Sequence, residues 1–176
     1  MKGKYILVLV GCLFATSIWA VNEVDKKGRK QGEWIKKYDN GVVMYKGVFK
    51  DDMPTGEFKR FYENGTLHSV QNHKDNNLSD IVIYEQDGKT ISTKGSYIGK
   101  VKDGRWTYYI EGKISLEEQF ENGKLNGLSK VYTKKGELIE EIPYVQGKID
   151  GVKRCFLADG KKYSEGAYKV GEEHGD

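Results

Sequence analysis

Two histidines, His68 and His73, form the pair of side chains in this sequence that comes closest to a chemical site. Imidazole nitrogens bind metals and transfer protons near neutral pH, so a nearby pair is the first candidate. Side chains alternate across a strand, so residues five apart face opposite ways and could share a metal only across a β-bulge. The alternative is an exposed polar strand. We predict that His68, Gln71 and His73 mark an irregular strand that contacts a partner, and that they bind no metal.

Carboxylates are numerous, but most stand where turns favour Asp and Asn for local backbone hydrogen bonds. These residues are Asp39, Glu63, Asp87, Asp103, Asp150 and Asp159. The pairs Glu117-Glu118 and Glu140-Glu141 are neighbours on strands, so their members face opposite ways. Acid–base catalysis needs two carboxyl groups that converge on one bond. The sequence also has no G-x-S-x-G, H-E-x-x-H, C-x-x-C or phosphate-binding glycine loop. We therefore predict no catalytic residue, no cofactor and no enzyme activity.

The elements that must position these side chains form an internal repeat. Glycines open successive units at Gly32, Gly56, Gly104, Gly127 and Gly151, and Ser79 stands where one more is expected. With Gly175 opening a further unit, the intervals are 24, 23, 25, 23, 24 and 24 residues. The predicted units are 32–55, 56–78, 79–103, 104–126, 127–150 and 151–174.

Each unit carries a turn about nine residues after its first position. The turns are Asn40-Gly41, Asn64-Gly65, Asp87-Gly88, Glu111-Gly112, Lys135-Gly136 and Asp159-Gly160. Asn-Gly and Asp-Gly predict type I′ hairpin turns, in which both central residues have positive φ. Each unit is therefore expected to be a β-hairpin.

Apolar residues between the turns recur at even spacings, which places them on one face of a strand. First strands have pairs four apart, namely Trp34/Tyr38, Phe58/Tyr62, Trp106/Ile110, Leu128/Tyr132 and Val152/Phe156. Second strands have pairs two apart, namely Gly47/Phe49, Gly95/Tyr97, Ile142/Tyr144 and Gly166/Tyr168. We expect the strand glycines to be covered by neighbouring rings. The aromatic residues are then core rather than a ligand platform.

These observations predict an all-β protein, an elongated and twisted antiparallel meander of about six two-stranded repeats. We expect a repeat domain over residues 32–176, preceded by a polar leader at 21–31. The repeat positions expected to specify the fold are Gly32, Trp34, Gly41, Phe49, Gly56, Phe58, Gly65, Gly104, Trp106, Gly127 and Gly151.

The N-terminus has the pattern of an export signal, residues 1–20, which we expect to be helical. Lys2 and Lys4 precede an apolar run too short to span a bilayer, and small residues then favour cleavage between Ala20 and Val21. A lipobox-like segment ending at Cys12 leaves lipidation as the alternative, and an uncleaved anchor as a third. Each places the chain outside the cytoplasm, periplasmic or extracellular, with Cys12 allowing a lipid anchor on the envelope.

The charge pattern argues against nucleic acid as a partner. Of 29 Lys and Arg residues, 27 remain after cleavage against 26 acidic residues, a net charge of about +1. An evenly mixed, near-neutral surface lacks the basic patch that nucleic-acid binding requires.

The units resemble MORN repeats, in the variant typical of the bacterial YwqK-type family described as an antitoxin component. The stretch from Gly56 to Gly65, GEFKRFYENG, carries the likeness most clearly, and the resemblance covers Gly32 to Gly175. It implies an elongated antiparallel scaffold, in some members associated with membranes or with itself. Two departures stand out. The second strand of the second unit, Thr66–Leu78, has Gln71 and His73 where other units have glycine and an aromatic, and Ser79 opens the next unit.

The expected function is an exported, non-enzymatic scaffold that binds a protein partner, a second copy or the envelope through a sheet face or an edge strand. One alternative is antitoxin-like neutralisation of a partner toxin. A carbohydrate-binding module or an enzyme would need a cleft that a regular meander does not supply.

Overall fold

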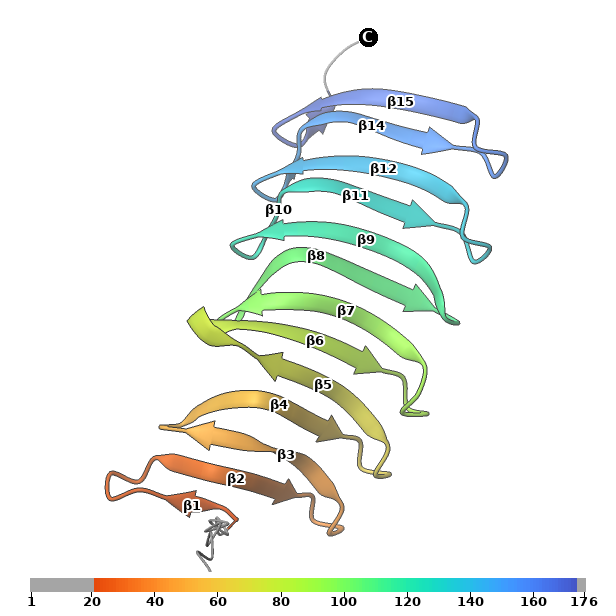
Figure 1. Ribbon diagram of the computed structural model, residues 1–176. Coiled ribbons are helices and arrows are strands. Elements are labelled where there is room, and N and C mark those ends of the chain that lie inside the picture. Colours follow the sequence, from red (N-terminus) through yellow and green to blue (C-terminus); the bar gives the residue numbers. More distant parts are fainter. Residues whose placement is uncertain (1–20, 174–176) are drawn as a thin grey trace, which may run out of the picture.

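A computed structural model describes residues 21–173, which form one sheet of 16 strands (Figure 1). The strands are β1 (Glu23–Val24), β2 (Lys30–Lys37), β3 (Val43–Lys50), β4 (Met53–Phe61), β5 (Leu67–His73), β6 (Leu78–Tyr84), β7 (Ile91–Ile98), β8 (Val101–Ile110), β9 (Lys113–Glu121), β10 (Lys124–Leu125), β11 (Gly127–Tyr132), β12 (Leu138–Val145), β13 (Lys148–Ile149), β14 (Gly151–Phe156), β15 (Lys162–Lys169) and β16 (Glu172–Glu173). A short 3₁₀ turn, η1 (Asp75–Asn77), joins β5 to β6.

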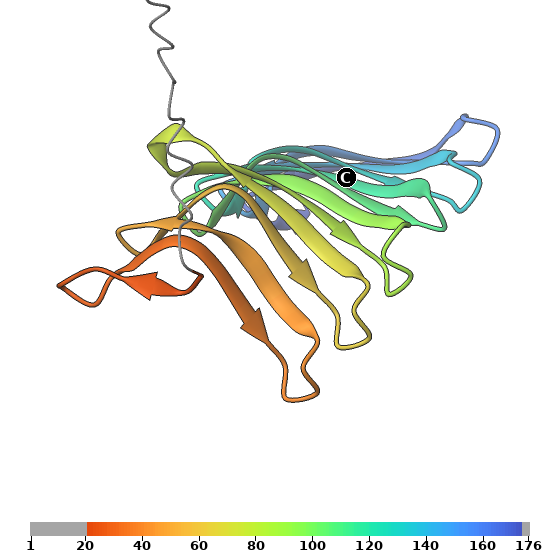
Figure 2. The same cartoon turned by 60° about the horizontal axis from the view of Figure 1, so that its bottom comes forward.

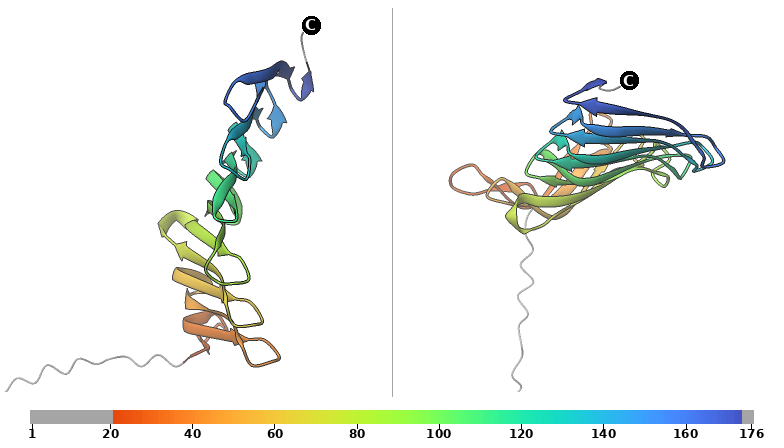
Figure 3. Two further views of the ribbon diagram at one scale, coloured as in Figure 1. Left: turned by 90° about the vertical axis from the view of Figure 1, so that its right-hand side faces the viewer. Right: turned by 90° about the horizontal axis from the view of Figure 1, so that it is seen from above.

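Consecutive long strands are neighbours in the sheet, and every pair is antiparallel. The predicted all-β meander of two-stranded repeats is therefore confirmed. Over residues 21–173 the sheet is a single layer with both faces open (Figure 3). Its strands fan progressively from β2 to β15, as the right-handed twist of β-strands requires (Figure 2). The predicted signal helix, Cys12 and Ala20 lie outside the described residues. Val21 is exposed at the start of the described chain.

The hairpin turns differ in type from the prediction. Of the six predicted turns within units, only Glu111-Gly112 has positive φ at both residues, at 52° and 76°. In the first unit the Gly41 N–H donates to the Tyr38 carbonyl, and the Tyr38 N–H donates to the Val42 carbonyl. This three-residue loop is a type I turn followed by a left-handed glycine, so only the glycine needs positive φ. The same bonds recur at Gly65, Gly136 and Gly160.

A β-bulge follows each turn at an equivalent place in the second strand. The residues skipped by the pairing register are Met44, His68, Ser92, Ser115, Ile139 and Tyr163. A bulge interrupts the alternation of side chains between faces. Simple even spacing therefore fails near the start of every second strand.

Rings that lie across glycines form the core, on what we call the aromatic face, the side bearing Phe58, Ile81 and Trp106. These are the buried hydrophobic residues of the described chain, at 4%, 8% and 2% exposure. A Cβ added to Gly47 would lie 2.2 Å from Cδ2 of Phe58, and one added to Gly95 would lie 2.3 Å from Cδ2 of Trp106. Each ring from the next unit thus occupies the volume that a side chain would need. The expected covering of strand glycines is confirmed at these two positions.

Where a unit lacks a strand glycine, the next unit has a smaller or more flexible residue in place of the ring. Gln71 pairs with Ile81, and the register places Glu118 beside Ser129 and Ile142 beside Lys153. The prediction that Leu128 is the equivalent of Trp34 in the fifth unit is wrong. Ser129 is 3% exposed there, whereas Leu128 is 39% exposed on the other face. The same holds for Val152 in the sixth unit. There the equivalent of Trp34 is Lys153, which pairs with Gly166.

Most units begin with a left-handed glycine. Gly32, Gly56 and Gly104 have φ of 68°, 63° and 71°, and the register shifts beside Gly56 and Gly104. Ser79 lacks this conformation, and β5 and β6 pair from Ser69↔Ile83 to His73↔Ser79 without a shift. Side chains strongly disfavour positive φ, so replacing glycine with serine changes this junction. The predicted departure at residues 66–80 is thus a change of hairpin geometry inside a continuous sheet.

The two edges of the sheet differ. At the N-terminal edge the Asn22 side chain forms the hydrogen bonds that a neighbouring strand would otherwise form. Its Oδ1 accepts the Ile35 N–H at 2.8 Å, and its Nδ2 donates to the Ile35 carbonyl at 3.0 Å. At the other edge, β16 pairs only with Tyr168 and Lys169 of β15. Within the described chain, residues 162–167 of β15 have no partner strand on their outer side.

Candidate interaction groove

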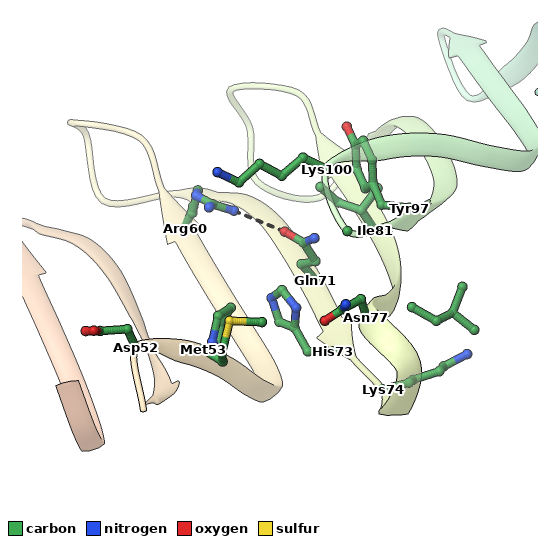
Figure 4. A pocket seen from close by; sticks show the side chains of 13 residues that line it. Asp52, Met53, Arg60, Gln71, His73, Lys74, Asn77, Ile81, Tyr97 and Lys100 are labelled. Carbon is green, nitrogen blue, oxygen red and sulfur yellow. Dashed lines mark hydrogen bonds between the residues drawn. The ribbon is translucent and has the colours of Figure 1, made fainter. Parts of the chain in front are cut away.

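A groove of about 640 Å³ opens on the aromatic face across β4, β5, β6 and β7 (Figure 4). It runs from the β3–β4 turn to the β7–β8 turn. Its lining residues are Asp52, Met53, Pro54, Arg60, Gln71, His73, Lys74, Asn77, Leu78, Ile81, Tyr97, Gly99 and Lys100. The groove therefore lies at the junction where the sequence departs from the regular repeat.

The absence of one ring explains why the face is hollow here. Where the fourth unit has Trp106 crossing Gly95, the third unit has Ile81 beside Gln71. An isoleucine side chain is shorter than an indole and does not extend over the neighbouring strand. The groove is the space that an aromatic residue at position 81 would occupy in part.

A chain of polar contacts crosses the groove. Arg60 Nη1 donates to Gln71 Oε1 at 3.4 Å, and Gln71 Nε2 donates to Ser79 Oγ at 2.9 Å. The Arg60 guanidinium also lies over the Phe58 ring, 5.0 Å from its centre. Gln71 is thus held between a cation and a serine that is only 2% exposed. The two sequence departures, Gln71 and Ser79, stabilise each other.

The two histidines do not form a joint site. His73 lies in the groove with its ring 6.2 Å from that of Phe58, whereas His68 lies outside it, 4.7 Å from the ring of Tyr62. The prediction that the two histidines face opposite ways assumed regular alternation along the strand. This prediction is wrong, because His68 is the bulged residue of its strand. Both rings pack against residues that alternate onto the aromatic face. Along the strand the two residues are separated by more than four residue rises of about 3.3 Å each.

Partial burial lowers the pKa of both His68 and His73, and the positive charge of Arg60 lowers each further. Both imidazoles are therefore mainly neutral at pH 7. A neutral His73 leaves Arg60 and Lys100 as the charged groups in this part of the groove.

The charges around the groove are unequally neutralised. Lys74 bonds to Asp80, and this bond, with a second from Ser96, lowers the Asp80 pKa. The Asp52 carboxylate points away from the groove (Figure 4) and accepts the backbone N–H of Lys30 at 2.9 Å. Among residues 21–173, no carboxylate lies within ion-pair distance of Arg60 or Lys100. The groove thus presents two cations with no anionic partner in the described chain.

The opposite face, which we call the charged face, is lined by ion pairs. Arg105 lies 3.9 Å from Glu117, while Glu141 lies 3.5 Å from Lys130 and 3.9 Å from Arg154. Burial and a hydrogen bond to Glu117 raise the pKa of Tyr132 to about 12. These cations of the charged face have acidic partners, in contrast to Arg60 and Lys100 in the groove.

The described residues offer little that resembles a metal site or an active site. Residues 21–173 contain no cluster of three or more His, Cys, Asp or Glu side chains placed to hold a metal. Asp87 and Asp159 accept backbone N–H groups in turns, at Thr90 and Lys161 among others. No helix in the described part of the chain is long and apolar enough to cross a membrane.

Sequence reasoning found Gln71 and His73 but missed Arg60, Lys100 and Met53 as groove residues. Arg60 lies four residues after Gly56, within a regular unit, and Lys100 lies in a turn between units. A signal was available in the columns of the repeat. Aligning the units shows Ile81 where Phe58 and Trp106 stand, and so predicts a gap above Gln71.

Comparison with known families identifies the class of repeat. The MORN repeat variant matches residues 30–51, 54–75 and 125–146. Three segments of the chain are therefore similar to MORN-type repeats, a class of repeat that generally serves as a non-catalytic scaffold, often for binding proteins or membranes. One matched segment, 54–75, includes Gln71 and His73, so the irregular second unit is itself similar to this type of repeat. No curated protein matches the chain.

Proposed function

We propose that the chain is an exported, non-enzymatic repeat scaffold that binds a protein partner through the groove on its aromatic face. The observation that carries this proposal is an open groove at the junction of the second and third units, lined by unmatched cations and exposed apolar atoms. A regular repeat offers a shallow sheet surface. Where one ring of the aromatic face is missing, the surface becomes concave and gives a partner a place to bind.

Export rests on the sequence of residues 1–20. Intact-mass measurement of the mature protein tests it: cleavage between Ala20 and Val21 gives one mass, and lipidation at Cys12 gives another. Recovery of the uncleaved chain from the cytoplasm contradicts export.

Two other partner types belong to the same proposal as alternatives. The envelope itself is one, and a second copy added at the open edge of β15 is the other. An antitoxin-like role would differ only in that the partner is a toxin, and it requires chain and toxin to share a compartment. No contact in the described chain favours the toxin over another protein.

Affinity capture from the native envelope with Arg60→Gln and Arg105→Gln variants tests the proposal. Both changes remove one positive charge, but Arg60 lines the groove and Arg105 lies on the charged face. We expect the partner to be lost from Arg60→Gln and retained by Arg105→Gln. Equal retention by both variants contradicts binding through the groove.

A further inference from the structure

The groove combines an unpaired pair of cations with an apolar floor. Arg60 reaches it from β4 and Lys100 from the β7–β8 turn, and the Lys100 side chain extends toward Arg60 (Figure 4). Two positive groups that line one groove repel in the free protein when no anion lies between them. A ligand carboxylate placed between them would remove this repulsion and accept hydrogen bonds from both.

Apolar groups flank this position. Met53 is 54% exposed, and Leu78, Ile81 and Tyr97 continue the lining beyond it. A bare anion would leave this surface in contact with water. The lining therefore fits a ligand that carries an apolar side chain next to its negative charge.

We propose that the groove binds an extended peptide segment that places a carboxylate between Arg60 and Lys100 and an adjacent aliphatic side chain on Met53, Leu78 and Ile81. A volume of 640 Å³ accommodates a short peptide. A polyanion such as nucleic acid fits less well, because the mature chain has a net charge of only about +1. The inference rests on the proposed function and specifies the chemistry of the partner.

Fluorescence anisotropy with three labelled peptides tests this assignment. The first alternates threonine and leucine around one central glutamate, with both ends blocked. The second replaces the glutamate with glutamine, and the third is the glutamine peptide with a free C-terminal carboxylate. We expect the glutamate peptide to bind about 10-fold or more tightly than the blocked glutamine peptide, as a charge-assisted hydrogen bond implies. Binding of the third peptide would identify a terminal carboxylate as an accepted source of the same group.

Matched variants locate the binding site. Arg60→Gln and Lys100→Gln should each weaken the glutamate peptide about 10-fold. Arg105→Gln, on the charged face, and Lys134→Gln, in an exposed turn, should leave its affinity unchanged. Thermal unfolding confirms that each variant is folded, and added salt should weaken binding of the wild type.

Three results would overturn the assignment: equal affinity for the glutamate and glutamine peptides, equal loss in the Arg60 and Arg105 variants, or no binding at about 1 mM peptide. Binding confined to anionic lipid vesicles would also overturn it. If partner capture still depends on Arg60 while the glutamate peptide fails to bind, the ligand chemistry is wrong and the proposed function stands.

Discussion

At the scale of single residues, the fold depends on which positions lack a side chain. Gly47 and Gly95 are needed because a ring occupies the place of their Cβ atoms, whereas Gly41 and Gly65 are needed for left-handed turns. Gly166 is the equivalent of Gly95 in the sixth unit, yet the one close contact of an added Cβ there would be the flexible Glu173 Oε1 at 2.9 Å, and Tyr168 Cε2 would lie at an ordinary 3.4 Å. Glycines at equivalent positions of the repeat therefore differ in how strongly the structure requires them.

Gly95→Ala should destabilise the protein strongly. The new methyl group would lie 2.3 Å from Trp106, whose indole is 2% exposed and packs against the rings of Tyr97 and Phe120. We expect a loss of roughly 3 kcal/mol in the free energy of unfolding, the upper end for overpacking. Gly166→Ala is the matched control and should cost less than about 1 kcal/mol, because the flexible Glu173 side chain can shift. Chemical denaturation measures both, and equal losses would contradict the ring-over-glycine packing.

The two histidines give stability a defined pH dependence. Because the folded-state pKa values of His68 and His73 lie below the ordinary 6.5, the unfolded chain binds protons more readily. Their contribution is complete above pH 6.5 and is lost as the pH falls through the lowered values. The urea midpoint should therefore fall from pH 7 to pH 5. A variant with His68→Gln and His73→Gln should show a flatter slope over this range, and an unchanged slope would contradict the shifts.

At the scale of strands and turns, the edges of the sheet differ in accessibility. Asn22→Ala removes the two side-chain bonds to Ile35 and should cost about 1 kcal/mol, because the backbone N–H and carbonyl of Ile35 at the sheet edge lose their protein partner. It should also promote concentration-dependent self-association through the freed edge of β2. Light scattering over a concentration series measures this effect.

Asn40→Ala is the control for the edge variant. It removes comparable turn bonds, to Val42 and Glu63, without opening an edge. It should lower stability to a similar degree but remain monodisperse. Association of both variants to the same extent would show that general destabilisation, rather than the edge, is the cause.

The elements were predictable from the sequence because their signals are local. Gly41, Gly65 and their equivalents mark turns through their own φ angles, and strand lengths follow from the turn spacing. Side-chain placement was less predictable because it depends on pairing. The bulge at His68 and the column of Ser129 both follow from the register between strands. The groove was hardest to predict, since it results from a missing ring above Gln71 and from Lys100 in a neighbouring turn.

At the scale of the whole molecule, each unit contacts only its neighbours, so stability should vary along the chain. The buried side chains lie between Phe58 and Ser129, and none lies among the described residues of the sixth unit, 151–173. We expect hydrogen exchange to be slowest in β4 to β9 and fastest in β14 to β16. Mass spectrometry of peptic fragments measures this gradient, and uniform protection would indicate a single cooperative unit.

The groove also lies within the best-buried part of this one-layer sheet. Buried Ile81 is part of its lining, Phe58 packs against the lining residues Arg60 and His73, and Trp106 packs one unit further on. A binding site on such a rigid region loses little conformational entropy when a partner binds. The whole molecule thus combines a stable centre that carries the groove with two edges of lower stability.

Differential hydrogen exchange with and without the captured partner tests directly whether the partner binds in the groove. We predict added protection in segments 52–60, 71–81 and 97–100, which line the groove, and little change in 130–156. The Arg60→Gln variant should lose this protection at the same partner concentration. Protection confined to β15, or to strands outside the second and third units, would contradict the groove as the binding site.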